Sequence, residues 1–217
     1  MTHPALPSLT GKIAVIGWGS LIWDLDDLAP KVAGDWAMAA GPRLPLEFSR
    51  ISPKRAMSLV VVLDPDDGAP CESHAIASIR DDIHAAAHDL QRRERAQSIA
   101  QIGAVCRRTR FVRATDERIA AAVTDWCAVH DIAGAVWTDL PRNFAEITGK
   151  PFGIPAGIAY LRELPERNLA EALRYITFAP GGTATPLRTA LEREDWWRDA
   201  RRRLLEAEDD PVDRRGQ

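Results

Sequence analysis

The chain has 217 residues, of which 46% are hydrophobic and 27% are charged, so it has enough apolar side chains for a buried core and is not a largely disordered protein. Its 28 Lys and Arg residues against 31 Asp and Glu residues give a formal net charge of −3, which argues against nucleic-acid binding through bulk electrostatics. No apolar run approaches the roughly 20 residues needed to cross a bilayer, and residues 1–9 lack the pattern of a signal peptide. We therefore expect a cytoplasmic protein with no membrane or nucleic-acid partner.

The predicted elements place strands first and helices last. Apolar and alternating segments predict strands over residues 12–16, 44–51, 58–63, 73–79, 105–112 and 135–138. Helical periodicity predicts helices over residues 81–97, 116–130, 155–164, 169–176 and 187–206. In the segment 44–51, apolar Leu44, Leu46 and Phe48 alternate with Pro45, Glu47 and Ser49, which is typical of a half-exposed strand. This order of elements favours an α+β fold.

A metal site is not expected. The three cysteines, Cys71, Cys106 and Cys127, are widely spaced and form no CxxC pair, so a zinc ribbon is excluded and inert thiols are expected. His84 and His88 lie four residues apart on a predicted helix, but no third ligand has a suitable spacing. We expect both histidines to be solvated.

Glu94 is the most informative charged residue. It follows Ile83 by eleven positions, about three helical turns, so it falls on the same stripe as Ile83 and Leu90. A carboxylate on an apolar stripe is desolvated, which raises its pKa and suits it to proton transfer near neutral pH. The alternative is that the helix has left the core by Glu94 and that the side chain only pairs with an arginine.

The turn Gly17-Trp18-Gly19-Ser20 follows the first predicted strand. Its glycines could belong to a dinucleotide-binding loop, although the third glycine and a clear βαβ unit are missing. Ser20 could be a nucleophile, although no G-x-S-x-G motif surrounds it. The remaining hypotheses are a cradle whose backbone N–H groups hold a ligand, and a purely structural turn.

Several segments resemble one known family. The run 13–23, IAVIGWGSLIW, resembles the Y-G-S-L turn of the γ-glutamylcyclotransferase-like superfamily, and is closest to its ChaC-like branch. Residues 46–50 and 55–63 resemble the paired strands that follow the turn, and residues 75–79 resemble the strand before the family helix. Leu90-Gln-Arg-Arg-Glu94 resembles the end of that helix. The turn carries Trp18 where the family usually has Tyr.

The resemblance implies a small mixed β-barrel with flanking helices, to which the helix predicted over residues 187–206 adds a C-terminal helical extension. It also implies release of 5-oxoproline from a γ-glutamyl peptide or amine, by attack of the α-amino group on its own γ-carbonyl, without a cofactor. Glu94 would be the general acid/base. The substrate-binding residues would be Trp18, Gly19, Ser20, Leu21, Arg50 and Arg55.

The expected organisation is a tail over residues 1–11, a cyclotransferase-like domain over 12–178, a helical extension over 179–208 and a second tail over 209–217. Two further functions stay open. One is a ligand-binding or interaction module on the same fold that does not turn over its ligand. The other is a nucleotide-dependent oxidoreductase that uses the Gly17 and Gly19 turn.

Overall fold

The computed structural model describes residues 6–209, so residues 1–5 and 210–217 of the expected tails lie outside the described residues. The strands are β1 (Ile13–Gly17), β2 (Val32–Ala37), β3 (Leu44–Ser52), β4 (Ser58–Leu63), β5 (Ala69–Cys71), β6 (His74–Ser78), β7 (Ile102–Cys106), β8 (Phe111–Arg113) and β9 (Gly134–Thr138). The α-helices are α1 (Ile83–Glu94), α2 (Glu117–Val129), α3 (Phe144–Thr148), α4 (Ile154–Glu163), α5 (Glu166–Thr177), α6 (Pro186–Leu191) and α7 (Asp195–Asp209). Short 3-10 helices are η1 (Gly19–Ile22), η2 (Asp26–Lys31), η3 (Pro53–Arg55) and η4 (Ile99–Gln101). None of the helices among residues 6–209 is long and apolar enough to span a membrane.

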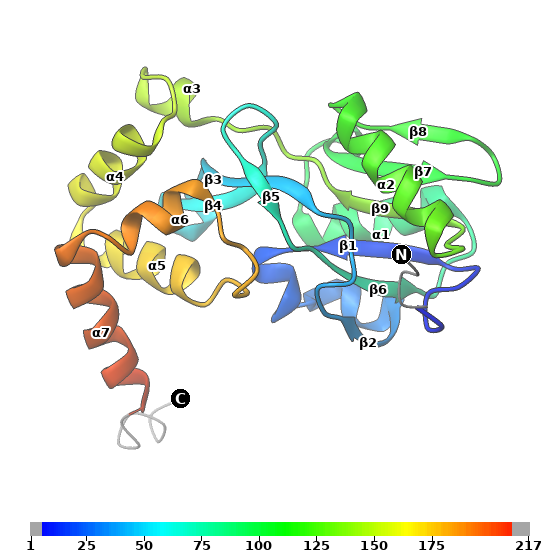
Figure 1. Ribbon diagram of the computed structural model, residues 1–217, viewed down its shortest axis with the longest axis horizontal. Helices are drawn as coiled ribbons and strands as arrows, with labels where there is room; N and C mark the ends of the chain where they lie inside the picture. The colour runs from blue at the N-terminus through cyan, green and yellow to red at the C-terminus, as the bar shows by residue number, and fades with distance from the viewer. Residues whose placement is uncertain (1–5, 210–217) are drawn as a thin grey trace.

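The α+β class is confirmed, and the strands form two separate sheets in two lobes (Figure 1). The larger sheet has six strands in the order β2-β6-β1-β9-β7-β8, and the smaller sheet has three in the order β4-β3-β5. Helices α3 to α7 gather around the smaller sheet, while α1 and α2 accompany the larger one.

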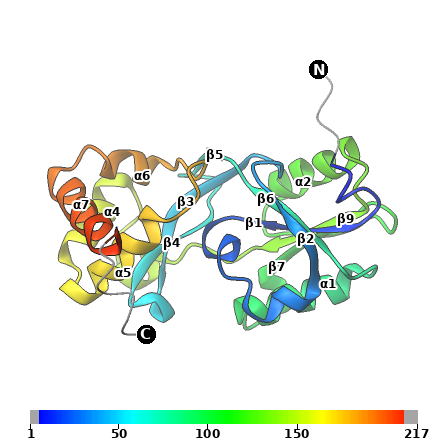
Figure 2. The same cartoon turned by 90° about the horizontal axis from the view of Figure 1, so that it is seen from below.

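Both faces of the six-stranded sheet are covered. Strand β1 is buried throughout and lies between β6, which is antiparallel to it, and β9, which is parallel. Ile13 and Val15 point into the core beneath α1, and Ala14 and Ile16 point into the core beneath α2, as alternation along a strand requires. Figure 2 shows the two helices on opposite faces of the sheet. The apolar run of β1 therefore reflects a central strand buried on both sides.

A crossing segment, residues 139–143, connects β9 of the large sheet to the helical lobe. The Asn143 side chain accepts a hydrogen bond from the Ile51 N–H (2.7 Å) and donates one to the Ile51 carbonyl (3.0 Å). Arg142 forms ion pairs with Asp64, Asp66 and Asp67 in the turn after β4. The side chains of Arg142 and Asn143 therefore attach this crossing segment to the small sheet.

Several sequence expectations are corrected. The described strands do not close into a barrel, because β3 pairs only with β4 and β5, outside the large sheet. The strand expected over 105–112 is a hairpin of β7 and β8, and β2, β5 and α3 were not predicted. The first helix ends at Glu94 because Arg95 adopts a left-handed conformation with φ of +51°. The division of the chain near residue 178 stays a prediction.

The helix expected over 187–206 is broken into α6 and α7. Leu191 and Trp197 are both buried in the same apolar core. Six residues apart in one continuous helix, they would point about 120° away from each other, so the turn between the helices is what directs both side chains inward.

Glu47 is fully buried, against the expectation of a half-exposed strand. Its carboxylate oxygens accept hydrogen bonds from the Phe48 N–H (2.7 Å) and the Leu187 N–H (3.0 Å). Burial raises the pKa of Glu47 to about 7, although these bonds and one with Thr185 act in the opposite direction. Glu47 therefore faces α6 rather than solvent. The alternation along β3 predicted an exposed side chain because it contains no information about α6.

We predict that Glu47 makes the fold less stable as the pH rises from about 5 to 7. The unfolded chain releases the Glu47 proton near its ordinary pKa of 4.5, while the folded protein keeps it until about pH 7. The free energy of unfolding therefore falls across this range, by on the order of 3 kcal/mol from this group. Urea denaturation at a series of pH values should show a shallower decline for Glu47→Gln than for the wild type. Glu163→Gln, at an exposed position, should keep the wild-type slope; an unchanged slope in Glu47→Gln would contradict the assignment.

Candidate functional site

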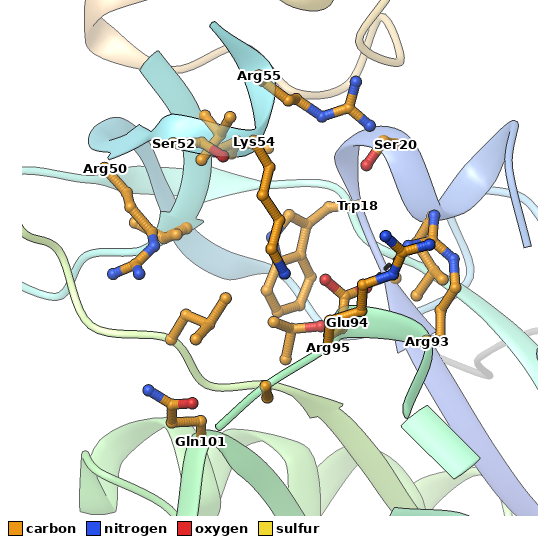
Figure 3. Close-up of a pocket in the computed structure, with 18 of the residues that line it drawn as sticks. Trp18, Ser20, Arg50, Ser52, Lys54, Arg55, Arg93, Glu94, Arg95 and Gln101 are labelled. Atoms are coloured by element: carbon orange, nitrogen blue, oxygen red, sulfur yellow. Dashed lines mark ion pairs between the residues drawn. The ribbon is translucent and has the colours of Figure 1, made fainter. Parts of the chain in front are cut away.

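A cavity of about 630 Å³ lies between the two lobes (Figure 3). The lobe that contains the large sheet contributes the end of β1 with the following turn, the C-terminus of α1 and the end of β9. The small lobe contributes the end of β3, η3, the middle of β4 and one side chain from α5. Segments distant in the sequence therefore meet at one concave surface, as is usual for a ligand site between structural units.

The cavity brings together every predicted site residue except Gly19. The lining includes Glu94, Trp18, Ser20, Leu21, Arg50 and Arg55. Gly19 lies behind this surface, against Val61 and Tyr175. The residues that had been predicted from separate motifs thus lie on one surface.

The turn after β1 requires glycine at position 19 for two reasons. Gly19 has φ of +60°, a left-handed conformation that residues with a Cβ rarely adopt. A Cβ at this position would lie 2.8 Å from the Val61 Cγ1 atom and 2.9 Å from the Tyr175 hydroxyl oxygen. The tight turn allows η1 to begin at Gly19, and the first N–H groups of a helix have no acceptor within it. The turn therefore has a structural role, and it places the start of η1 at the cavity, where Ser20 and Leu21 line the surface.

Glu94 is the last residue of α1, and its side chain faces the cavity (Figure 3). Only 20% of this side chain is exposed, and its one ion pair among residues 6–209 is a long one of 4.0 Å to Arg93. Burial raises the pKa of Glu94, while the positive charges of Arg93, Arg55 and Lys54 act to lower it and Asp24 acts to raise it. The negative end of the α1 dipole also opposes a charged carboxylate at this position. Glu94 is thus a desolvated carboxyl group without a strong partner in the part of the chain that the structure describes.

The structure combines features of both predictions for Glu94, the desolvated carboxyl group and the side chain that pairs with an arginine. The helix does end there, and an arginine is nearby, but the pairing is weak and the side chain points into a cavity rather than into bulk solvent. Helical periodicity predicted the direction of the Glu94 side chain, because Ile83 and Leu90, which share its stripe on α1, are buried.

The arginines around the cavity differ in their partners. Arg55 pairs with Glu171 (3.2 Å), Arg93 with Asp24 (3.6 Å) and Arg95 with Asp26 (3.6 Å). Arg50 donates a hydrogen bond to the Pro141 carbonyl and has no ion pair among residues 6–209. The cavity surface therefore contains groups of both signs, most of them already neutralised.

Tyr175, from α5, is a cavity residue that sequence reasoning missed. Its ring lies under the Arg55 guanidinium, 4.9 Å from the ring centroid, and its hydroxyl is close to the Gly19 backbone. Burial raises the pKa of Tyr175 to about 12, while the charge of Arg55 and a hydrogen bond with Ser20 act to lower it. Only its place on the buried face of an amphipathic helix could have marked it, and that signal does not distinguish a core tyrosine from a site residue.

The other interpretations of the turn find no support in its geometry. After β1 the chain forms only 3-10 turns and then β2, which pairs with antiparallel β6, so the strand–helix–strand unit of a dinucleotide site does not follow. The described residues that line the cavity include no histidine that could activate Ser20. His84 and His88 are exposed, and the described residues hold no group of His, Cys, Asp and Glu with the geometry of a metal site.

Comparisons with models of protein families, with curated proteins and with solved structures find no match to this chain.

The double requirement for glycine at position 19 can be tested with a matched pair of variants. Gly34 has φ of +75°, but a Cβ there would meet nothing within 4 Å. Gly34→Ala should therefore cost only the backbone strain, about 1 kcal/mol. Gly19→Ala should cost the same strain plus the collision with Val61 and Tyr175, and denaturant unfolding should show the larger loss. Equal losses in the two variants would mean that the turn is not held against α5 as tightly as these distances imply.

Proposed function

We propose that this protein is a γ-glutamylcyclotransferase-like enzyme that releases 5-oxoproline from a γ-glutamyl peptide or amine, with Glu94 as general acid/base. The observation that carries the proposal is a desolvated Glu94 carboxyl group that has no strong partner among the described residues and lies in a cavity shared with the turn of residues 17–21. The resemblance of the turn and of residues 90–94 to that superfamily supports the same activity. A cyclotransferase-like assignment of the fold is part of this proposal.

The reaction needs one group that first accepts and then donates a proton. Glu94 accepts a proton from the substrate α-ammonium, and the resulting amine attacks the γ-carbonyl carbon. A C–N bond forms to close the five-membered ring, and the original amide C–N bond then breaks. The leaving nitrogen takes the proton from Glu94 as this bond breaks. The ring nitrogen gives up its second proton, which ends on the released amine, so that the amine departs as an ammonium and Glu94 is again a carboxylate. A raised pKa makes Glu94 a stronger base toward the ammonium, which suits the first step.

The charges around the cavity match a γ-glutamyl group, which has both an ammonium and a carboxylate. Glu94 and Asp24 can face the ammonium, while Arg55, which lies close enough for its charge to act on Glu94, can bind the α-carboxylate. Backbone N–H groups at the start of η1 can hold an oxygen of the substrate. Holding the amine and the γ-carbonyl together in this way favours ring closure through orientation.

Glu94→Gln should abolish turnover by orders of magnitude while substrate affinity and fold stability stay close to those of the wild type, because glutamine has the same shape but cannot transfer the proton. The measurement is mass spectrometry of 5-oxoproline after incubation with glutathione, γ-glutamyl dipeptides and γ-glutamyl amines. Glu163→Gln, exposed on α4, is the matched control and should keep full activity. Binding of these compounds by the wild type without product would instead support the module that does not turn over its ligand.

The acid limb of the pH profile of kcat/KM should lie above pH 4.5, the ordinary pKa of a glutamate, because only deprotonated Glu94 can accept the proton. Removing a nearby positive charge with Lys54→Gln should move this limb to higher pH. Removing a nearby negative charge with Asp24→Asn should move it to lower pH. Steady-state kinetics from pH 4 to 8 would measure both shifts, and limbs that stay fixed in both variants would exclude Glu94 as the group that titrates.

A further inference from the structure

Arg50 differs from the other arginines of the cavity in having no carboxylate partner. Arg55, Arg93 and Arg95 each form an ion pair with a carboxylate, whereas the only hydrogen bond of the Arg50 side chain among residues 6–209 goes from Nη1 to the Pro141 carbonyl. Its Nε and Nη2 groups remain available as a planar pair of donors, which is the geometry that binds a carboxylate through two hydrogen bonds.

An irregularity in β3 directs Arg50 into the cavity. Glu47 is opposite Val62 and Arg50 is opposite Val60, so three steps along β3 correspond to two along β4, and β3 contains one extra residue. Regular alternation would place Arg50 on the face of Leu46 and Phe48. The bulge turns it to the other face, where its neighbour Val60 also lines the cavity.

Arg50 lies in a different part of the cavity from Glu94, the proposed acid/base. Figure 3 shows Arg50 and Glu94 on opposite sides of the cavity, with Lys54 between them. The carboxylates of the lining, Asp24, Asp26 and Glu94, all come from the turn region and α1. The lining side chains Ser52, Gln101 and Asn143 are polar and uncharged.

The Arg50 guanidinium is half-buried, and desolvation lowers its pKa. The exposed Glu146 carboxylate is the acidic group whose charge acts on it, but the two form no ion pair. A desolvated guanidinium with free donors has more to gain from an anionic ligand than one that is already paired.

We propose that Arg50 binds a carboxylate on the leaving half of the substrate, so that γ-glutamyl conjugates of amino acids and peptides are favoured over γ-glutamyl amines that lack a carboxylate. This inference rests on the proposed function and specifies its substrate class. Arg55 and Arg50 then have different roles, since Arg55 serves the γ-glutamyl half beside Glu94 and Arg50 serves the half that leaves.

The test compares γ-glutamylglycine with γ-glutamylglycinamide, which differ only in a terminal carboxylate or carboxamide. The wild type should favour γ-glutamylglycine in kcat/KM by about tenfold or more. Arg50→Gln should lose this preference by lowering kcat/KM for γ-glutamylglycine alone. Arg43→Gln is the matched control, because Arg43 is exposed, also donates to a proline carbonyl and lies outside the cavity lining, so the preference should be unchanged. Equal losses for both substrates in Arg50→Gln, or no preference in the wild type, would overturn the proposal.

A binding measurement separates failure of this inference from failure of the proposed function. Calorimetry with the same two compounds on Glu94→Gln, with and without Arg50→Gln, reports the carboxylate preference without turnover. If the wild type forms no 5-oxoproline but the preference in affinity depends on Arg50, the reaction is wrong and the Arg50 subsite is upheld. If the two compounds bind equally well, or neither binds, the Arg50 subsite is refuted whether or not the wild type turns them over.

Discussion

The site depends on the attachment of the crossing segment to the edge of the small sheet. Residues 141–143 are bound in succession, because the Pro141 carbonyl accepts from Arg50, Arg142 pairs with the acidic turn after β4, and Asn143 bonds to both backbone groups of Ile51. The Asn143 amide takes the place of one residue in a β-ladder. These contacts hold two sheets that share no strand, and the cavity lies where their strands end. A change in this segment would alter the spacing between Arg50 and Glu94 without touching either residue.

The cavity also illustrates how one helix end can prepare a carboxyl group for proton transfer. Glu94 ends α1, Arg95 turns the chain away in a left-handed conformation, and the nearby arginines are drawn toward Asp24 and Asp26. Glu94 is left desolvated, while the nearby Arg55, Arg93 and Arg95 already form ion pairs with other carboxylates. The opposing influences of burial and of neighbouring cations keep its pKa raised without removing its ability to ionise.

Local sequence signals predicted the parts of the structure that depend on interactions between residues close together in the sequence. Periodicity placed β1, β4, α2 and the direction of Glu94, and the paired glycines marked the turn that lines the cavity. The misses share a different cause. The burial of Glu47 depends on α6, which is 140 residues away, the availability of Arg50 depends on a bulge, and Tyr175 enters the cavity from a helix that follows both sheets. Separation into two sheets depends on which strands pair, and alternation within one strand contains no information on its partner.

The position of Tyr175 also has a consequence for how the protein is made. The turn at Gly19 is among the first parts of the described chain to be synthesised, but the hydroxyl that packs against it belongs to α5 and is made more than 150 residues later. Strand β1 likewise acquires its parallel neighbour β9 only after most of the large sheet has been translated. The cavity is therefore completed late on the ribosome, and a nascent chain that ends before α5 leaves the wall behind the Gly19 turn unfilled.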